Sequence, residues 1–141
     1  MGIDTHDRAC GGRGEDVMEL ARFWRVGGAW AAATGVAMGA VAAHLPSERF
    51  GLPEGRTIVQ EAVQMQMWHA LALLALGVSV RRSSRLTALA GCGLWCGMVI
   101  FCLALYVTAF SGHHLGPVAP TGGSMLIASW TLLGVAFLRH D

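Results

Sequence analysis

The sequence has no lysine and little charge of either sign. Charged residues make up 13% of its 141 positions, whereas apolar residues make up 54%. A soluble domain carries roughly 25% charged residues, and a soluble protein this small needs a charged shell because much of its surface faces water. The composition therefore excludes an ordinary soluble domain. The absence of lysine beside ten arginines indicates a bias in genome composition and no particular chemistry.

Other absences concern chemistry. With a net charge of +1, the sequence lacks the excess of basic residues that is typical of nucleic-acid-binding proteins. The chain contains no HExxH or CxxC motif, no phosphate-binding loop, no nucleophile–base pair and no paired intramembrane carboxylates, so no catalytic set and no cofactor are evident. Its cysteines do not fall in the two loops that we place outside the membrane, so a structural disulfide is not expected. The four are Cys10, Cys92, Cys96 and Cys102.

What the sequence does have is four long apolar runs. About 20 apolar residues span the ~30 Å hydrocarbon core of a bilayer. A spanning segment must satisfy its own backbone hydrogen bonds there, so each run is predicted to be a helix. A cleavable signal peptide, with Ala40-Val41-Ala42 as its cleavage site, fits the first run less well, because that run is too long and three more follow. The predicted helices cover about residues 25–44, 58–80, 86–110 and 121–138.

The segment before the first run has a different composition. Residues 1–22 hold four of the nine acids within their first sixteen positions and show no apolar period. They are predicted to be a disordered cytoplasmic tail, leaving residues 23–141 as the transmembrane domain. Met18 is an alternative start for the protein. Further along, Thr57-Ile58-Val59-Gln60 fits a capping box, which places the start of the second helix near Ile58.

Arginines beside the spans predict the orientation. Eight lie at the N-terminal end up to Arg25, in the turn at residues 81–85 and at the C-terminus, whereas the loops at 45–61 and 111–120 hold two. Because basic residues are enriched on the cytoplasmic side, both termini are predicted to be cytoplasmic. The sequence thus predicts an all-α, antiparallel four-helix bundle that crosses a bacterial cytoplasmic (inner) membrane four times.

Small residues recur at helical spacing. Gly35 and Gly39 lie one turn apart on the first helix, and Gly93 and Gly97 do so on the third. Small residues four apart let two helices approach closely inside a membrane. Two interpretations stay open: packing within the bundle, and a face for a dimer or a partner helix.

Polar residues gather toward the predicted outer half of the helices. Such groups are costly in lipid and usually face the interior of a bundle, so we expect them to converge. Three interpretations of this cluster stay open: a hydrogen-bond network that fixes packing, a metal or haem ligand set, and a polar path or small-ligand pocket. The residues are His44, Gln64, Gln66, His69, His113 and His114.

Aromatic residues divide by their predicted depth. Four lie toward the membrane surfaces and are expected to form an anchoring belt. Trp95 and Trp130 lie near mid-membrane, where packing is expected. The belt comprises Trp24, Trp68, Tyr106 and Phe110.

Several strings resemble the domain of unknown function 423 family, which includes the eukaryotic transmembrane protein 256. The resemblance covers roughly residues 25–138 and implies a small four-helix membrane protein of uncharacterised activity. It also implies that His44 and His69 are the motif histidines. One departure stands out, since this chain has Leu45-Pro46 where the family usually has glycine. The strings are Ala42-Ala43-His44, Gln66 through Leu74, Gly97 through Phe101 to Tyr106, and Ala119 through Gly123 followed by Trp130.

These observations predict a non-enzymatic structural or accessory membrane component. Its expected partners are the lipid bilayer and a second copy or a larger membrane complex. Two alternatives stay open: a small transporter or pore for a polar solute or proton, and a metal- or haem-binding redox subunit.

Overall fold

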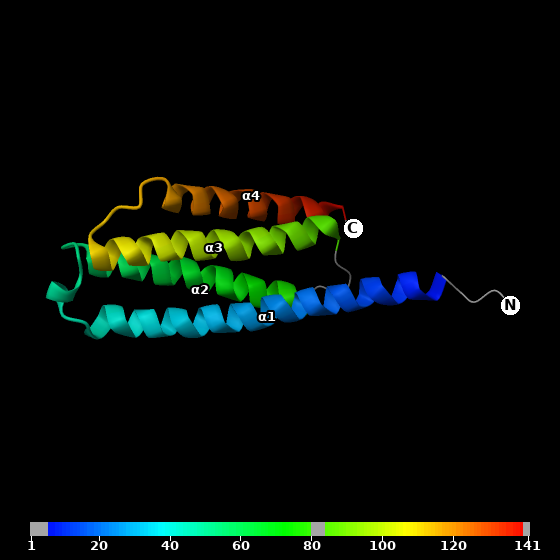
Figure 1. Cartoon of the computed structure of the whole chain (residues 1–141), viewed down its shortest axis with the longest axis horizontal. Helices are drawn as coiled ribbons and strands as arrows, with labels where there is room; N and C mark the ends of the chain where they lie inside the picture. Colours follow the sequence, from blue (N-terminus) through cyan, green and yellow to red (C-terminus); the bar gives the residue numbers. More distant parts are fainter. Residues whose placement is uncertain (1–5, 80–83, 140–141) are drawn as a thin grey trace.

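The computed structural model describes residues 6–79 and 84–139, and this part of the chain is built of helices (Figure 1). Each of the four long helices contains a segment that is long and apolar enough to cross a membrane. The all-α transmembrane fold predicted from the sequence is therefore confirmed. The helices are α1 (His6–His44), α2 (Gly55–Ser79), α3 (Arg85–Ser111) and α4 (Val118–Leu138), with a single turn of 3-10 helix, η1 (Ser47–Arg49), before α2.

The start of α1 differs from the sequence prediction. The helix begins at His6, within the stretch expected to be a disordered tail, and its candidate span is Val17–His44. The last turns of that stretch are held by packing as well as by helix propensity. Ala21 is buried, and Leu20 packs against the main hydrophobic core. The predicted tail therefore contributes to the fold from about Leu20 onward.

Two other helices begin earlier than predicted. The first backbone bonds of α2 run from Gly55 N to Leu52 O and from Ile58 N to Glu54 O, at 2.9 and 3.1 Å. Thr57 therefore lies inside the first turn, and the predicted capping box is wrong. The helix α4 begins at Val118 instead of residue 121, because Pro120 sits in the first turn, where a missing N–H is tolerated. The other ends of α2, α3 and α4 agree with prediction to within one residue. In the predicted cationic turn, Arg81 and Arg82 lie outside the described residues.

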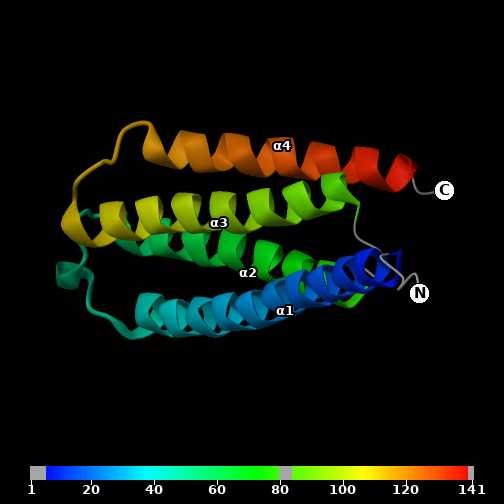
Figure 2. The ribbon, with the colours of Figure 1, turned by 45° about the vertical axis from the view of Figure 1, so that its right-hand side comes forward.

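The helices are arranged in a row of two hairpins (Figure 2). The helix α1 packs along α2, α3 packs along α4, and α2 joins the two hairpins by packing against α3. The helix α1 touches α3 at few points, and α4 packs chiefly against α3. The start of α1 and the end of α4 lie at one end of the molecule, and the α1–α2 and α3–α4 connections lie at the other, which is called the loop end below (Figure 1).

Glycines bring the two helices of each hairpin together. A Cβ on Gly35 would lie 3.0 Å from the sulfur of Met67 on α2, and one on Gly39 would lie 3.7 Å from Val63. A Cβ on Gly97 would lie 3.1 Å from the carbonyl oxygen of Gly122 on α4. Gly93 faces the hydroxyl of Ser129 on α4 at still shorter range. All four predicted packing glycines thus lie at contacts within a hairpin, where small residues let backbones approach.

Arg56 closes the loop end of α1. The last carbonyls of a helix have no partner within it. The guanidinium of Arg56 donates to the carbonyls of Ala42 and Ala43 and, at 2.7 Å, to that of Leu45. It also lies 5.5 Å from the centre of the Phe50 ring. The cap covers the place where this sequence departs from the pattern of the family that it resembles.

Candidate functional site

Gln66 on α2 ties three helices together. Its side chain is 7% exposed. Its Nε2 donates to the carbonyl oxygen of Ala31 and to Oγ1 of Thr34 on α1, both at 2.8 Å. Its Oε1 accepts a hydrogen bond of 2.7 Å from the hydroxyl of Tyr106 on α3. This buried side chain therefore supplies polar contacts between α1 and α3, which otherwise touch at few points.

The donor in each of these bonds is determined by the Ala31 carbonyl. A carbonyl can only accept, so the Gln66 atom that faces Ala31 must be Nε2. The other amide atom, Oε1, can only accept, and the Tyr106 hydroxyl must therefore donate to it. Thr34 receives a hydrogen from Gln66, so its own hydroxyl donates to the carbonyl of Trp30 or Ala31, at 2.9 and 3.0 Å. Every O–H and N–H hydrogen of this network is thus used within the protein.

His69 forms a second polar link, from α2 to α4. Its side chain is 5% exposed. Nδ1 lies 2.7 Å from the carbonyl oxygen of Met65, and Nε2 accepts a bond of 3.2 Å from Nε1 of Trp130. A carbonyl cannot donate and an indole N–H cannot accept, so in these two bonds Nδ1 donates and Nε2 accepts. Both ring nitrogens therefore have partners, and the imidazole holds α4 to α2, which it otherwise barely contacts.

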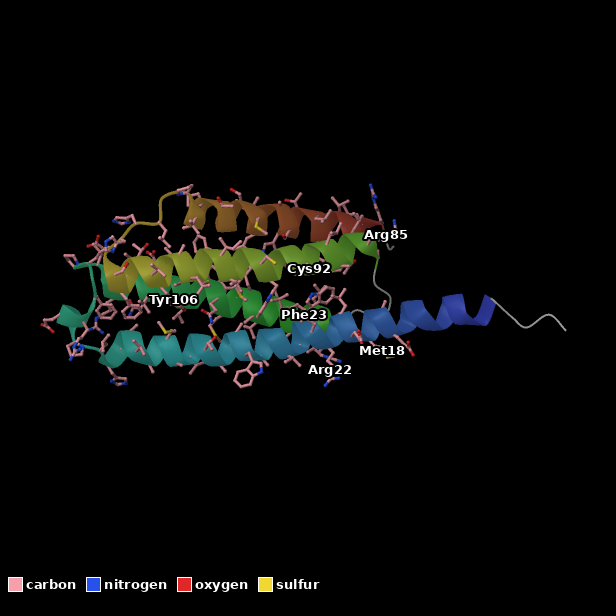
Figure 3. The ribbon with its side chains drawn as sticks, viewed as in Figure 1. Met18, Arg22, Phe23, Arg85, Cys92 and Tyr106 are labelled. Carbon is pink, nitrogen blue, oxygen red and sulfur yellow. The ribbon has the colours of Figure 1, made fainter. Side chains whose placement is uncertain are left out.

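A groove of about 430 Å³ lies between α1 and α3. Its α1 wall runs from Trp30 to Met38, and its α3 wall runs from Trp95 to Tyr106. Gln66 is the α2 residue that lines it, so the polar network forms its floor. Figure 3 shows Tyr106 toward the loop end of α3. The rest of the lining is mainly apolar: Ala31, Met98, Val99, Cys102 and Leu103, together with the hydroxyl-bearing Thr34.

The structure does not bring the six predicted site residues together. Gln66 and His69 are buried in different networks, while the side chains of the other four are exposed. In residues 6–79 and 84–139, no three His, Cys, Asp or Glu side chains are grouped so that they could hold a metal ion. The four exposed residues lie at a helix end, in a loop and on the outer face of α2, away from the groove lining. They are His44, Gln64, His113 and His114.

Two further polar members of the site were not predicted as site residues. Tyr106 was expected in an interfacial belt, and Thr34 was not singled out. A tyrosine that is the only one in the chain, within an apolar helix, is a usable signal because its hydroxyl needs a partner. The belt prediction is wrong for Trp24, which is 1% exposed and lies in the core. Trp130, expected to pack at mid-membrane, also donates to His69.

The comparisons with known proteins agree with this architecture. Residues 38–123 match the family described as "Protein of unknown function (DUF423)". The chain is 37% identical over 106 residues to the UPF0382 inner membrane protein YgdD of Escherichia coli K12, covering 74% of this chain and 80% of that protein. It is 33% identical over 113 residues to a UPF0382 membrane protein of Staphylococcus epidermidis, covering 79% and 92%.

A third relative is a UPF0382 membrane protein of Staphylococcus haemolyticus, which is 34% identical over 84 residues, or 59% of this chain and 69% of that protein. No solved structure matches the chain. The family match covers the end of α1, all of α2 and α3 and the start of α4, so it contains Gln66, His69 and Tyr106. The chain belongs to the DUF423 family and is an all-α membrane protein with four spanning helices.

Proposed function

We propose that this protein is a non-enzymatic membrane component that holds a lipid-soluble molecule in the groove between α1 and α3. The observation that carries the proposal is the groove itself. In a closed bundle a fourth helix would cover this face, but here α4 packs on the far side of the row, against α3. The groove has a volume within the roughly 300–1,000 Å³ of small-molecule sites.

The length of the groove favours a small molecule over a partner helix. A helix rises about 1.5 Å per residue, so the walls from Trp30 to Met38 and from Trp95 to Tyr106 are roughly 12 and 16 Å long. A partner helix would need to pack over the ~30 Å of the hydrocarbon core. The groove covers about half of that length, near mid-membrane, and therefore suits an occupant shorter than a spanning helix.

The chemistry of the lining supports holding a molecule over transforming it. Aromatic rings and sulfur atoms line the groove, and no carboxylate or imidazole is among the described residues that form it. The sulfur of its single cysteine, Cys102, lies 3.5 Å from the Ala62 carbonyl oxygen and so has a partner. Such a lining offers polarisable surface for dispersion contacts with an apolar molecule.

The groove can be tested by native mass spectrometry of the full chain extracted in mild detergent. We expect a discrete lipid-soluble mass to be retained by the wild type and lost in Trp30→Ala and in Val99→Phe, which open and fill the groove. Trp68→Ala is the matched control, because Trp68 is 57% exposed on α2 and does not line the groove. Equal retention in all four proteins would rule out the groove as the site. The same spectra report self-association or a partner chain.

We further propose that the protein lies in the bacterial inner membrane with both termini in the cytoplasm. The relative from Escherichia coli is called an inner membrane protein. Of the two arginines expected outside, Arg56 caps α1 by hydrogen bonding to its last carbonyls, and Arg49 is exposed. The loop end therefore carries little free positive charge. A C-terminal green fluorescent protein fusion is expected to fluoresce, and a C-terminal alkaline phosphatase fusion is expected to be inactive. An active phosphatase fusion would reverse the proposed orientation.

A further inference from the structure

We propose that the molecule held in the groove carries a hydroxyl group, as a lipid-soluble alcohol or phenol does. This inference rests on the proposed function and specifies its ligand. It follows from which donors and acceptors at the floor of the groove are not already used in hydrogen bonds within the protein.

No donor remains free at the floor. Gln66 Nε2 donates both of its hydrogens to acceptors on α1, and the Tyr106 hydroxyl donates to Oε1 of Gln66. The Thr34 hydroxyl donates to a backbone carbonyl of its own helix. At this floor, a ligand group that brings only an acceptor, such as an ether or a ketone, therefore finds no hydrogen to bind without breaking the network. The indole N–H groups of Trp30 and Trp95 belong to the walls of the groove.

Acceptors do remain. The amide oxygen of Gln66 has two lone pairs and uses one for Tyr106. The hydroxyl oxygens of Tyr106 and Thr34 each keep a lone pair beyond the bonds described. All three residues line the groove. The site therefore matches a ligand group that donates a hydrogen.

The depth of the floor strengthens this selectivity. Thr34 lies ten residues before the end of α1 and Gln66 lies eleven residues after the start of α2, so both are roughly 15 Å from the loop end. That distance places Thr34 and Gln66 near the middle of the ~30 Å hydrocarbon core, where water does not compete for hydrogen bonds. Tyr106 reaches Gln66 from a position nearer the loop end of α3. A hydroxyl at this depth would find few other acceptors, and lipid headgroups lie too far away to supply one.

The test uses matched ligands that differ in the hydroxyl alone. Geranylgeraniol and its methyl ether form one pair, and 4-dodecylphenol and 4-dodecylanisole form the other. Each pair is added in equal amounts to the full-length protein, and the bound masses are counted by native mass spectrometry. We expect the hydroxyl compound to be bound about three- to tenfold more than its ether, which corresponds to one neutral hydrogen bond. The pair with the larger ratio identifies the alcohol or the phenol as the source.

The outcomes separate this inference from the proposed function. Equal binding of hydroxyl and ether compounds would overturn the hydroxyl inference and leave the groove intact as a site. Binding of neither pair, together with no groove-dependent mass in the isolated protein, would overturn both. The variant Gln66→Met removes one acceptor and frees the Tyr106 hydroxyl as a donor, so the ratio should fall to about one. An unchanged ratio in folded Gln66→Met would contradict the inference, and the wild-type ratios decide the matter if that variant does not fold.

Discussion

Replacing Gly122 by valine is expected to lower the free energy of unfolding by about 3 kcal/mol and to loosen α4 from α3. A Cβ at this position would lie 2.6 Å from the backbone nitrogen of Phe101 and 3.0 Å from the carbonyl oxygen of Gly97. These are helix backbone atoms, which cannot rotate aside as a side chain can, so the helices must separate. Overpacking of this kind typically costs about 1–3 kcal/mol and occasionally more. Reversible unfolding in mixed detergent micelles, followed by circular dichroism, measures the change.

Gly134→Val is the matched control on the same helix. Nothing lies within 4 Å of a Cβ built on Gly134, so this variant carries the same change of helix propensity without the contact. We expect it to unfold close to the wild type. If both variants lost the same stability, the effect would come from valine in a helix, and close packing of α3 on α4 at Gly122 would not be its cause.

Replacing Gln66 by leucine is expected to destabilise the protein by about 2–4 kcal/mol and to let α1 and α3 move relative to each other. The change removes three hydrogen bonds between helices and leaves the Tyr106 hydroxyl without its acceptor. Interhelical hydrogen bonds in membranes are worth roughly 0.6–2 kcal/mol each, and an orphaned buried donor adds its own penalty. Unfolding by the same titration, together with cross-linking of cysteines placed on α1 and α3, would report both effects.

The neighbouring Gln64→Leu supplies the comparison. Gln64 is exposed on α2 and is not among the residues that line the groove, so its removal should change the stability by less than about 0.5 kcal/mol. Tyr106→Phe should destabilise the protein by about a third as much as Gln66→Leu does, because it deletes one of the three hydrogen bonds. A Gln66→Leu variant as stable as Gln64→Leu would show that the network does not hold the helices together.

The spans were predictable because the preference of an apolar segment for lipid does not depend on which other helices it packs against. A run of apolar residues must be helical in lipid whatever it packs against, so most helix ends agree with prediction to within one residue. The start of α1 was missed because Leu20 and Ala21 are held by contacts with the rest of the fold, which local composition does not reveal. The early start of α4 differs from the prediction because proline is typical of loops, although the first turn of a helix also accommodates it.

The candidate site was predictable only in its α2 residues. Gln66 and His69 share a face of a helix because they lie three residues apart, and a buried polar pair needs partners. Which partners they find depends on the order of the helices in space. Because polar groups are costly in lipid and usually face the interior of a bundle, the sequence predicted that His44, His113 and His114 would lie beside them. In the row of hairpins, the partners come instead from Thr34, Tyr106 and Trp130.

The order of the helices in the row determines which contacts first resist a pulling force on the C-terminus. A load applied at the C-terminus first meets α4, which is held by α3 along its length and by the hydrogen bond from Trp130 to His69. The α1–α2 contact, with its glycines and the Arg56 cap, lies outside that hairpin, although Trp24 of α1 shares the main core with Leu94 of α3. The α3–α4 contact is therefore the first to resist such a load, and the groove, whose walls come one from each hairpin, exists only while both hairpins are in place.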